Sequence, residues 1–267
     1  MLVRNLIDAA RAAAFRAYKR LRRLLARVGF LRSGYYLLLA IQEAALDSPA
    51  RGRAELDQEF KRREDPWDYA AVPDQRDRIR TEVEMLDAVR GSRRFAKALE
   101  VGCAEGMFTE MLSSRCDSLL AVDISQVALA RACQRLRGHN NIRLAEWDLR
   151  VDALPESYDL IVLIHALEYV RNPLGVRRAR KKLVNGLLPG GYLLVGAMKT
   201  SEIHENAWWG RYFVRSGKRI TSFFAGHPAL RVVWTAEFRL GKDYISYDVL
   251  LQKQSANHEA MGTRGAA

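Results

Sequence analysis

The sequence contains few cysteines and no long apolar run. Its three cysteines, Cys103, Cys116 and Cys133, show no paired spacing of the C-x-x-C kind, so neither a metal site nor a disulfide framework is expected. The longest apolar run, residues 35–41, is too short to span a bilayer and lacks the position and the cleavage site of a signal peptide. These absences predict a cytoplasmic protein, with peripheral attachment to a membrane as the alternative.

Negative charge is scarce at the N-terminal end of the chain. Residues 1–36 contain nine lysines and arginines and one acid, Asp8, which gives +8 of the net charge of +12. The other 231 residues carry only +4. The body of the chain is therefore not expected to form a strongly basic nucleic-acid-binding surface, and nucleic acid is not an expected partner.

These basic residues follow a helical pattern. Residues 1–45 contain no proline, and one face of the expected helix carries Arg16, Lys19, Arg20, Arg23 and Arg27, opposite Leu21, Leu24, Leu25 and Val28. Three interpretations stay open. The helix docks on the domain with a solvated basic face, or it attaches to an anionic membrane surface or an acidic partner, or it is a transit peptide.

The rest of the chain has the composition of a soluble globular domain, with 49% hydrophobic and 28% charged residues overall. Residues 47–53, which contain Pro and Gly, interrupt the helical pattern and predict a linker. We therefore divide the chain into a helical extension with its linker (1–59), a main domain (60–254) and a disordered tail (255–267).

Apolar runs alternate with helical patterns in the main domain. After an amphipathic helix at 74–90, strands are predicted at 98–101, 118–122, 142–146, 158–164 and 192–197, and helices at 109–114, 125–136 and 174–188. This alternation predicts a Rossmann-like, doubly wound α/β fold with a mostly parallel sheet. The last two strands, 231–240 and 244–252, have only three residues between them. They are expected to close a seven-stranded sheet as an antiparallel hairpin.

The loop Leu99–Gly106 follows the first strand of this series. In open α/β sheets ligands bind beyond the carboxyl ends of the strands, where small residues let the backbone approach them. The dinucleotide fingerprint G-x-G-x-x-G does not fit, because it would need glycines at Ala104 and Met107. The pattern present is acid-x-G-x-x-x-G, which predicts a different cofactor, with a turn that binds no ligand as the alternative.

Acids follow the next two strands. Asp123 lies twenty-one residues beyond Gly102, where a carboxylate can accept hydrogen bonds from both ribose hydroxyls. The alternative is that Asp123 caps the next helix, a role that Ser125 can also fill. Asp148 follows the third strand, where it can accept a hydrogen bond from the adenine amine. Three successive strand ends thus indicate one cofactor site.

These motifs resemble those of class I S-adenosylmethionine (SAM)-dependent methyltransferases across about residues 95–200. The resemblance rests on Glu100–Gly106, Asp123, Asp148, the His-Ala-Leu-Glu-Tyr run at 165–169 and the Leu-Pro-Gly-Gly run at 188–191. It implies that Glu100 holds the methionine amino group through a loop lined by Gly102, Cys103 and Gly106, and that SAM is the cofactor. The predicted cofactor set also contains Arg78, Ala104, Ile124, Leu149 and His165, and Trp67, for which ordinary packing is the alternative. Ala104 stands where the family usually has glycine, which alanine can replace if the local φ is negative.

A narrower resemblance, to NodS-type N-methyltransferases, covers about residues 60–170. It rests on Phe-Lys-Arg-Arg-Glu-Asp-Pro-Trp-Asp-Tyr at 60–69, Ala-Leu-Glu-Val-Gly-Cys at 98–103 and Ser-Arg-Cys-Asp-Ser-Leu-Leu-Ala-Val-Asp at 114–123. That group N-methylates the amino sugar of a deacetylated chitooligosaccharide. The chain departs from it at 165–169, which is closer to generic small-molecule methyltransferases, and at 73–75, where the group tends to have an aromatic residue.

Candidate catalytic residues follow the fourth strand. His165 is the expected general base because its ordinary pKa is near neutrality, with packing or helix capping as the alternative. Glu168 either attracts a cationic amine or binds backbone. Between the fifth and sixth strands, His204, Trp208 and Trp209 are candidate substrate-binding residues, since tryptophans stack on sugars and rings; the alternative is a small satellite core.

The sequence therefore predicts SAM-dependent methyl transfer to an amino or hydroxyl group of a small polar acceptor, such as an amino sugar or a secondary metabolite. One alternative is a nucleic-acid-modifying methyltransferase or RNA-binding protein that uses the basic N-terminal helix. Against it, the Asn/Asp-Pro-Pro-aromatic motif of base amino methyltransferases is absent after the fourth strand. The other alternative is a membrane-docked scaffold with a vestigial SAM site.

Overall fold

The computed structural model describes residues 41, 47–67, 69, 72–198, 217–240 and 244–255. The expected helix over residues 1–45 and the expected tail lie outside the described residues, apart from Ile41 and Ser255. So does the predicted substrate-binding segment with His204, Trp208 and Trp209. The fold below is that of the described part.

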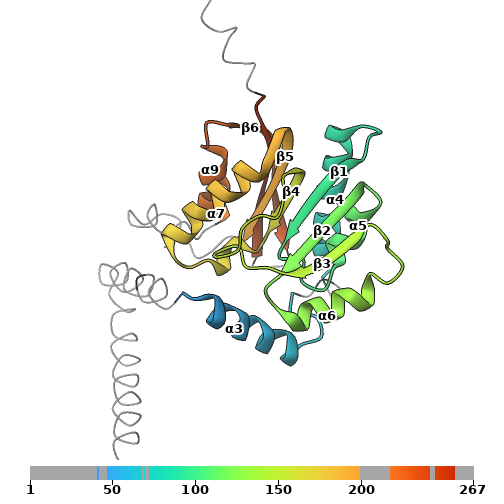
Figure 1. Cartoon of the computed structure of the whole chain (residues 1–267), viewed down its shortest axis with the longest axis vertical. Coiled ribbons are helices and arrows are strands. Elements are labelled where there is room, and N and C mark those ends of the chain that lie inside the picture. Colours follow the sequence, from blue (N-terminus) through green and yellow to red (C-terminus); the bar gives the residue numbers. More distant parts are fainter. Residues whose placement is uncertain are drawn as a thin grey trace, which may run out of the picture.

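A seven-stranded sheet forms the centre of the domain, in the order β3-β2-β1-β4-β5-β7-β6 (Figure 1). Its strands are β1 (Phe95–Val101), β2 (Cys116–Asp123), β3 (Ile142–Glu146), β4 (Tyr158–Ile164), β5 (Leu187–Met198), β6 (Leu230–Leu240) and β7 (Tyr244–Lys253). The first five are parallel, and β7 pairs antiparallel with both β5 and β6. The predicted Rossmann-like fold with its closing hairpin is confirmed.

The helices are α3 (Pro49–Arg62), α4 (Pro73–Arg90), α5 (Met107–Ser113), α6 (Gln126–Arg135), the short 3-10 helix η1 (Leu167–Tyr169), α7 (Pro173–Gly186) and α9 (Gly217–Ala225). Two buried apolar clusters pack around the central strands. Strand β4 contributes to both clusters because its side chains alternate between the two faces; Ile161 and Leu163 belong to one, Leu160 and Val162 to the other. This double burial explains why β4 reads as a continuous apolar run.

Two local predictions are wrong. Residues 47–53 are not a linker: helix α3 begins at Pro49, and the side chain of Ser48 caps it by accepting a hydrogen bond from the amide of Arg51 at 3.3 Å. Proline at the first position of a helix is favourable, so the Pro that read as a break is a start signal. Helix α7 ends at Gly186, and the Pro-Gly-Gly run at 189–191 lies inside β5, beside a register shift in the β4–β5 pairing.

The site-forming feature of the sheet is the boundary between β1 and β4. From β1 the chain winds outward through β2 and β3, and it then returns to place β4 on the other side of β1. Such a switch in winding direction opens a crevice beyond the carboxyl ends of the strands. Helix α3 runs below this edge of the sheet in Figure 1.

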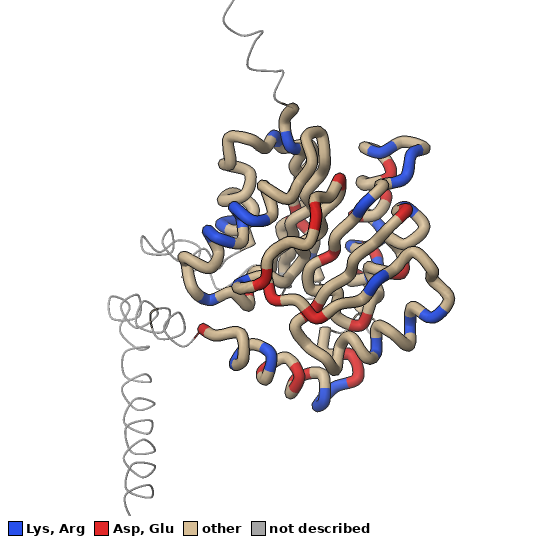
Figure 2. The backbone as a smooth tube through the Cα atoms, in the orientation of Figure 1, with Lys and Arg blue, Asp and Glu red and all other residues tan. Residues whose placement is uncertain are grey.

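Charges of both signs are distributed over the described domain rather than gathered by sign (Figure 2). The main concentration of one sign is on α7, which carries Arg177, Arg178, Arg180, Lys181 and Lys182. In the described part of the chain, no helix has the length and apolar character that crossing a membrane requires.

Candidate active site

A pocket of about 720 Å³ lies beyond the carboxyl ends of β1, β2 and β4. Strand-end residues form its floor: Val101, Gly102, Ala104, Asp123, Ile124, Asp148, Leu149 and His165. Residues of α3 and the turn that follows it form another wall, among them Phe60 and Trp67. The pocket thus brings together most of the predicted cofactor residues.

The loop after β1 turns sharply because three residues have a left-handed backbone. Gly102 and Gly106 each have φ of 80°, a conformation that glycine adopts without steric cost. A Cβ at Gly102 would lie 2.7 Å from Cβ of Ala166, so the loop and the segment after β4 approach too closely for any side chain. The third residue is Ala104, with φ of 48°. The condition set for alanine here, a negative φ, is therefore not met, and Ala104 adopts a conformation that costs about 1 kcal/mol.

Asp123 stabilises this strained loop. Its carboxylate accepts hydrogen bonds from the amide of Ala104 at 3.0 Å and from that of Ser125 at 2.8 Å. Burial raises its pKa, and these backbone donors act in the opposite direction. The helix-capping alternative does not replace the cofactor role, because Ser125 caps α6 by accepting a bond from Ala128 at 3.1 Å while Asp123 lines the pocket.

Glu100 lies behind the loop, beside a second cavity of about 20 Å³ that shares Val101 and Gly102 with the main pocket. Arg78, Glu100 and Cys103 all line this smaller cavity. Glu100 is only 4% exposed; the Thr109 side chain is placed to hydrogen-bond to its carboxylate, and no cation among the described residues pairs with it. Burial and the charge of Asp123 raise the pKa of Glu100 to about 7, against the effect of Thr109. A buried carboxylate without a cationic partner fits a cationic ligand group.

Arg78 does not line the main pocket. Its guanidinium is buried and binds Glu82 Oε1 at 2.5 Å and Gln75 Oε1 at 3.3 Å. This pairing raises the pKa of Arg78 despite its burial. Its position behind the loop makes it a partner of buried acids, and direct contact with the cofactor stays a prediction.

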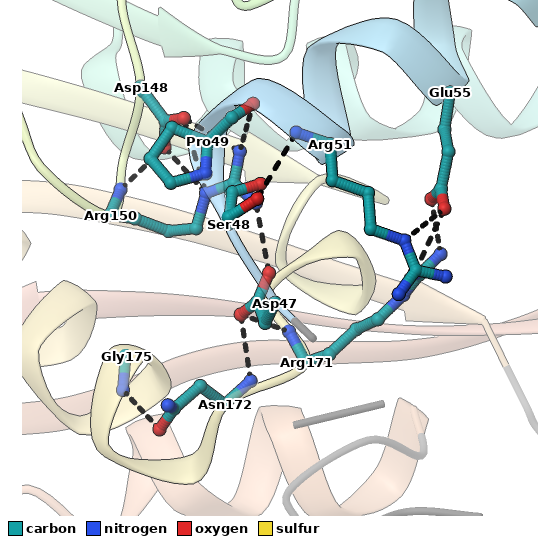
Figure 3. Close-up of polar contacts among 10 residues, drawn as sticks. All are labelled: Asp47, Ser48, Pro49, Arg51, Glu55, Asp148, Arg150, Arg171, Asn172 and Gly175. Carbon is teal, nitrogen blue, oxygen red and sulfur yellow. Dashed lines mark hydrogen bonds and ion pairs between the residues drawn. The ribbon is translucent and has the colours of Figure 1, made fainter. Parts of the chain in front are cut away.

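Asp148 is held by an arginine that sequence analysis did not identify. Both of its carboxylate oxygens bind Arg150, the shortest contact being 2.7 Å, and Arg150 also binds Asp47 Oδ1 at 2.9 Å (Figure 3). Hydrogen bonds and charge from Arg150 lower the pKa of Asp148, against the effect of burial. The acid predicted to bind adenine is thus ionised and fixed in place.

Asp47 and Arg171 also hold α3 against the site through hydrogen bonds and an ion pair. Asp47 Oδ2 accepts hydrogen bonds from the amides of Arg171 and Asn172 at 3.0 and 2.9 Å, and Arg171 binds Glu55 of α3 at 2.7 Å (Figure 3). Helix α3 is therefore part of the pocket wall. Its residue Phe60 meets the ring of Trp67 edge-on at 6.1 Å between centroids, and Trp67 meets Tyr169 at 6.0 Å. Trp67, predicted as a cofactor residue, belongs to this aromatic wall.

His165 lies in the pocket at the end of β4, with a strained φ of 52°. Its Nε2 atom is 2.7 Å from Oγ of Ser246 on β7. Burial and the nearby charge of Arg78 hold the pKa of His165 well below 6.5, so the ring is neutral at neutral pH. A neutral ring keeps a lone pair that can accept a hydrogen bond or a proton.

Glu168, one turn further, fills the backbone role considered for it and keeps one oxygen free for the other. Its Oε1 atom accepts a hydrogen bond from the amide of Met198 at 2.7 Å, which is the backbone role. Its Oε2 atom is buried without a partner among the described residues, and the side chain lines the pocket. Burial raises the pKa of Glu168 to about 7. One oxygen thus anchors the side chain, and the other stays available to a ligand.

Comparison with known proteins places this geometry in a family. The family described as Nodulation protein S (NodS) matches residues 48–216. The chain belongs to this family. It is a SAM-dependent methyltransferase. It is 34% identical to nodulation protein S of Sinorhizobium fredii over 134 residues, which cover 50% of this chain and 61% of that protein. It is 35% identical to that of Bradyrhizobium diazoefficiens over 149 residues, 55% of this chain and 68% of that protein.

A solved structure extends the likeness to the whole fold. The N-methyltransferase NodS from Bradyrhizobium japonicum WM9, in complex with S-adenosyl-L-homocysteine, matches with a TM-score of 0.66 and 28% identity. The match covers 76% of this chain and 99% of that one. The family match begins at residue 48, the cap of α3, which agrees with α3 being part of the site. Neither alternative function proposed from the sequence finds support in these comparisons.

SAM fits the described residues. The buried carboxylate of Glu100, which no cation among the described residues pairs with, suits a cationic amino group. Gly102 leaves room for close approach to the backbone, and Asp123 and the Asp148–Arg150 pair line the floor of the main pocket. Sequence analysis missed Phe60, Arg150, Tyr169, Ser246 and Asp248. For Phe60 and Tyr169 a signal existed, since they belong to the runs at 60–69 and 165–169 on which the resemblances rest. For Arg150, Ser246 and Asp248 only proximity in the fold identifies them.

Proposed function

We propose that this chain transfers the methyl group of SAM to the amino group of a small polar acceptor, an amino sugar being the first candidate. The observation that carries the proposal is the free, buried Oε2 atom of Glu168 in the pocket wall beside His165. An acceptor ammonium entering the pocket would meet an anion that lacks a partner. The N-methyltransferase NodS, with its matching fold, supports the choice of nitrogen over oxygen.

When bound, SAM supplies a methyl group on a positively charged sulfur. An ammonium nitrogen has no lone pair, so it must lose one proton before it can accept that group. Glu168 binds the ammonium as an ion pair, and with a pKa of about 7 it is matched to accept that proton near neutral pH. His165 stays neutral and accepts a hydrogen bond from the nitrogen. Phe60, Trp67 and Tyr169 exclude water from the pocket wall.

The pocket residues proposed to hold the cofactor are those predicted from the sequence. Asp123 is assigned to the ribose and Asp148 to the adenine, with Ile124 and Leu149 beside them in the pocket floor. Glu100 is assigned to the methionine amino group, at the end of the pocket that continues into the smaller cavity. The end of the main domain at residue 254 and binding of the acceptor by His204, Trp208 and Trp209 are kept as predictions, whereas a domain start at residue 60 would divide α3.

The test uses isotope-labelled SAM with two matched acceptors. One is a chitooligosaccharide with a free amino group on its terminal sugar, and the other is the same oligosaccharide fully N-acetylated. Label is expected in the first product only, and Glu168→Gln should reduce its rate about a hundredfold. Labelling of both acceptors would show a hydroxyl target and contradict the proposal. Binding of SAM without labelling of either acceptor, or of simple amino sugars, would contradict the choice of acceptor class.

A further inference from the structure

A chain of buried polar side chains leads from His165 away from the pocket. His165 Nε2 is 2.7 Å from Ser246 Oγ, and Ser246 Oγ donates a hydrogen bond to Asp248 Oδ1 at 2.6 Å. Ser246 is fully buried and Asp248 is 2% exposed. The proposed mechanism gives neither of them a role. Burial of an acid and a hydroxyl next to the pocket is costly unless they are hydrogen-bonded to each other and to their neighbours.

The directions of these hydrogen bonds follow from the proton count. A serine hydroxyl has one proton, and here it is donated to Asp248. Ser246 can therefore only accept from His165, which places the ring proton on Nε2. In a neutral ring Nδ1 then carries a lone pair, and Nδ1 hydrogen-bonds to none of the residues that the structure describes.

Beyond Asp248 the series of buried polar side chains continues to Glu82, which keeps the Asp248 carboxylate a hydrogen-bond acceptor. Glu82 Oε2 and Asp248 Oδ2 are both buried and lack a donor among the described residues, and Asp248 lies close enough to Glu82 to raise its pKa. One proton shared between them satisfies both oxygens. Burial raises the pKa of Glu82 well above 4.5, so Glu82 holds that proton, while its Oε1 accepts from Arg78.

The backbone of β4, β5 and β7 leaves room for these side chains. The amide of His165 donates to the carbonyl of Gly196 at 2.8 Å, and Gly196 pairs with Asp248 across β5 and β7. A Cβ at Gly196 would lie 2.7 Å from Asp248 Oδ1 and would displace the carboxylate. The antiparallel hairpin therefore brings Ser246 and Asp248 under the end of β4.

We propose that Ser246 and Asp248 are positioning residues, which hold His165 as the Nε2-protonated tautomer and so present Nδ1 to the acceptor nitrogen. A hydrogen bond from the acceptor N–H to Nδ1 fixes the direction of the nitrogen lone pair, which is an orientation effect on the rate. The role in the reaction rests on the proposed function, whereas the tautomer is a property of the folded chain alone. The titratable groups near His165 and its partners Ser246 and Asp248 are Arg78, Glu82 and Glu168.

The tautomer is measured by NMR on the full chain labelled with ¹⁵N-histidine, from pH 5.5 to 8.5, without SAM or acceptor. The His165 signals are those that vanish in His165→Gln. We expect the Nε2–H tautomer with no titration over this range. Asp248→Asn should reverse the direction of these hydrogen bonds. The amide oxygen of the new side chain accepts the Glu82 proton, and its NH₂ group donates to Ser246. Ser246 then donates to Nε2, and the ring becomes the Nδ1–H tautomer.

Two further variants control for folding. Ser246→Ala should yield a mixture of tautomers, whereas Ser118→Ala, at an exposed serine of β2, should leave the His165 signals unchanged. With an active acceptor, Asp248→Asn is expected to lower kcat at least about tenfold and to change the KM for SAM less than about twofold. A wild-type ring that is Nδ1-protonated or titrates near pH 6.5, or signals that are the same in Ser246→Ala, would overturn the proposal. Failure of every acceptor would leave the NMR result standing and would refute only the proposed function.

Discussion

Glu100 offers the sharpest test of the site, because its replacement should stabilise the protein while it weakens cofactor binding. The side chain is 4% exposed, no cation among the described residues pairs with it, and burial raises its pKa from 4.5 to about 7. A shift of that size corresponds to about 3 kcal/mol. Glu100→Gln keeps the shape of the protonated acid and removes the cost of the charge.

The sign of the pH dependence follows from the two states. Below pH 4.5 the acid is protonated whether the chain is folded or unfolded, so ionisation costs nothing. Between pH 4.5 and about 7 the unfolded chain loses the proton while the folded chain keeps it, and the free energy of unfolding falls. Above pH 7 the full cost of about 3 kcal/mol is present. The advantage of Glu100→Gln over wild type should therefore be near zero at pH 4.5 and close to this value at pH 8.5.

Urea unfolding without SAM, at several pH values, measures this difference as a change in midpoint at constant m-value. Glu84→Gln, at an exposed glutamate of α4, is the matched control and should show no such gain. Calorimetry at pH 8 should show SAM affinity at least tenfold weaker in Glu100→Gln, since a charged partner of the amino group is lost. A variant that is no more stable at pH 8.5 than at pH 4.5, relative to wild type, would refute the reasoning.

Three further predictions concern the loop and α3. Ala104→Gly should stabilise the fold by up to about 1 kcal/mol, because φ at this residue is 48°; a lower melting temperature would contradict the strain. Gly102→Ala should abolish SAM binding by calorimetry, since its Cβ would lie 2.7 Å from that of Ala166; unchanged affinity would show that the loop can relax. Arg150→Met should lower the free energy of urea unfolding by about 3 kcal/mol, because Asp47 and Asp148 lose their shared cation, and a loss below 1 kcal/mol would show that water replaces it.

Local sequence patterns predicted the helices and strands well where the hydrophobic pattern and the capping residues indicate the same element. Strands β3 and β4 have the predicted bounds, and Ser125 caps α6 as its position suggested. The errors occurred at prolines. Pro49 and Pro189 were both taken as breaks, yet one begins a helix and the other lies in a strand. Proline excludes the interior of a helix but allows both of these positions, so context decides between them.

The candidate cofactor residues could be named from the sequence because they lie at or near strand ends that are marked in it. Gly102 and Asp148 follow strands, Asp123 ends one, and Glu100 is the last but one residue of β1; parallel strands bring their carboxyl ends to one edge. The wall formed by α3 was not predictable in this way. Asp47 and Arg150 are 103 positions apart and share no repeat or spacing, so only the folded chain shows their ion pair.

What the sequence by itself determined is the class of fold and the methyl donor, since hydrophobic periodicity and strand-end residues act over short distances along the chain. Tertiary structure decided the pKa values of the ionisable side chains in the site. The raised pKa values of Glu100 and Glu168 and the lowered pKa of His165 come from burial, and burial depends on which elements cover a residue. Ser246 reaches His165 across 81 positions because β7 pairs with β5, and that pairing is a property of the whole sheet.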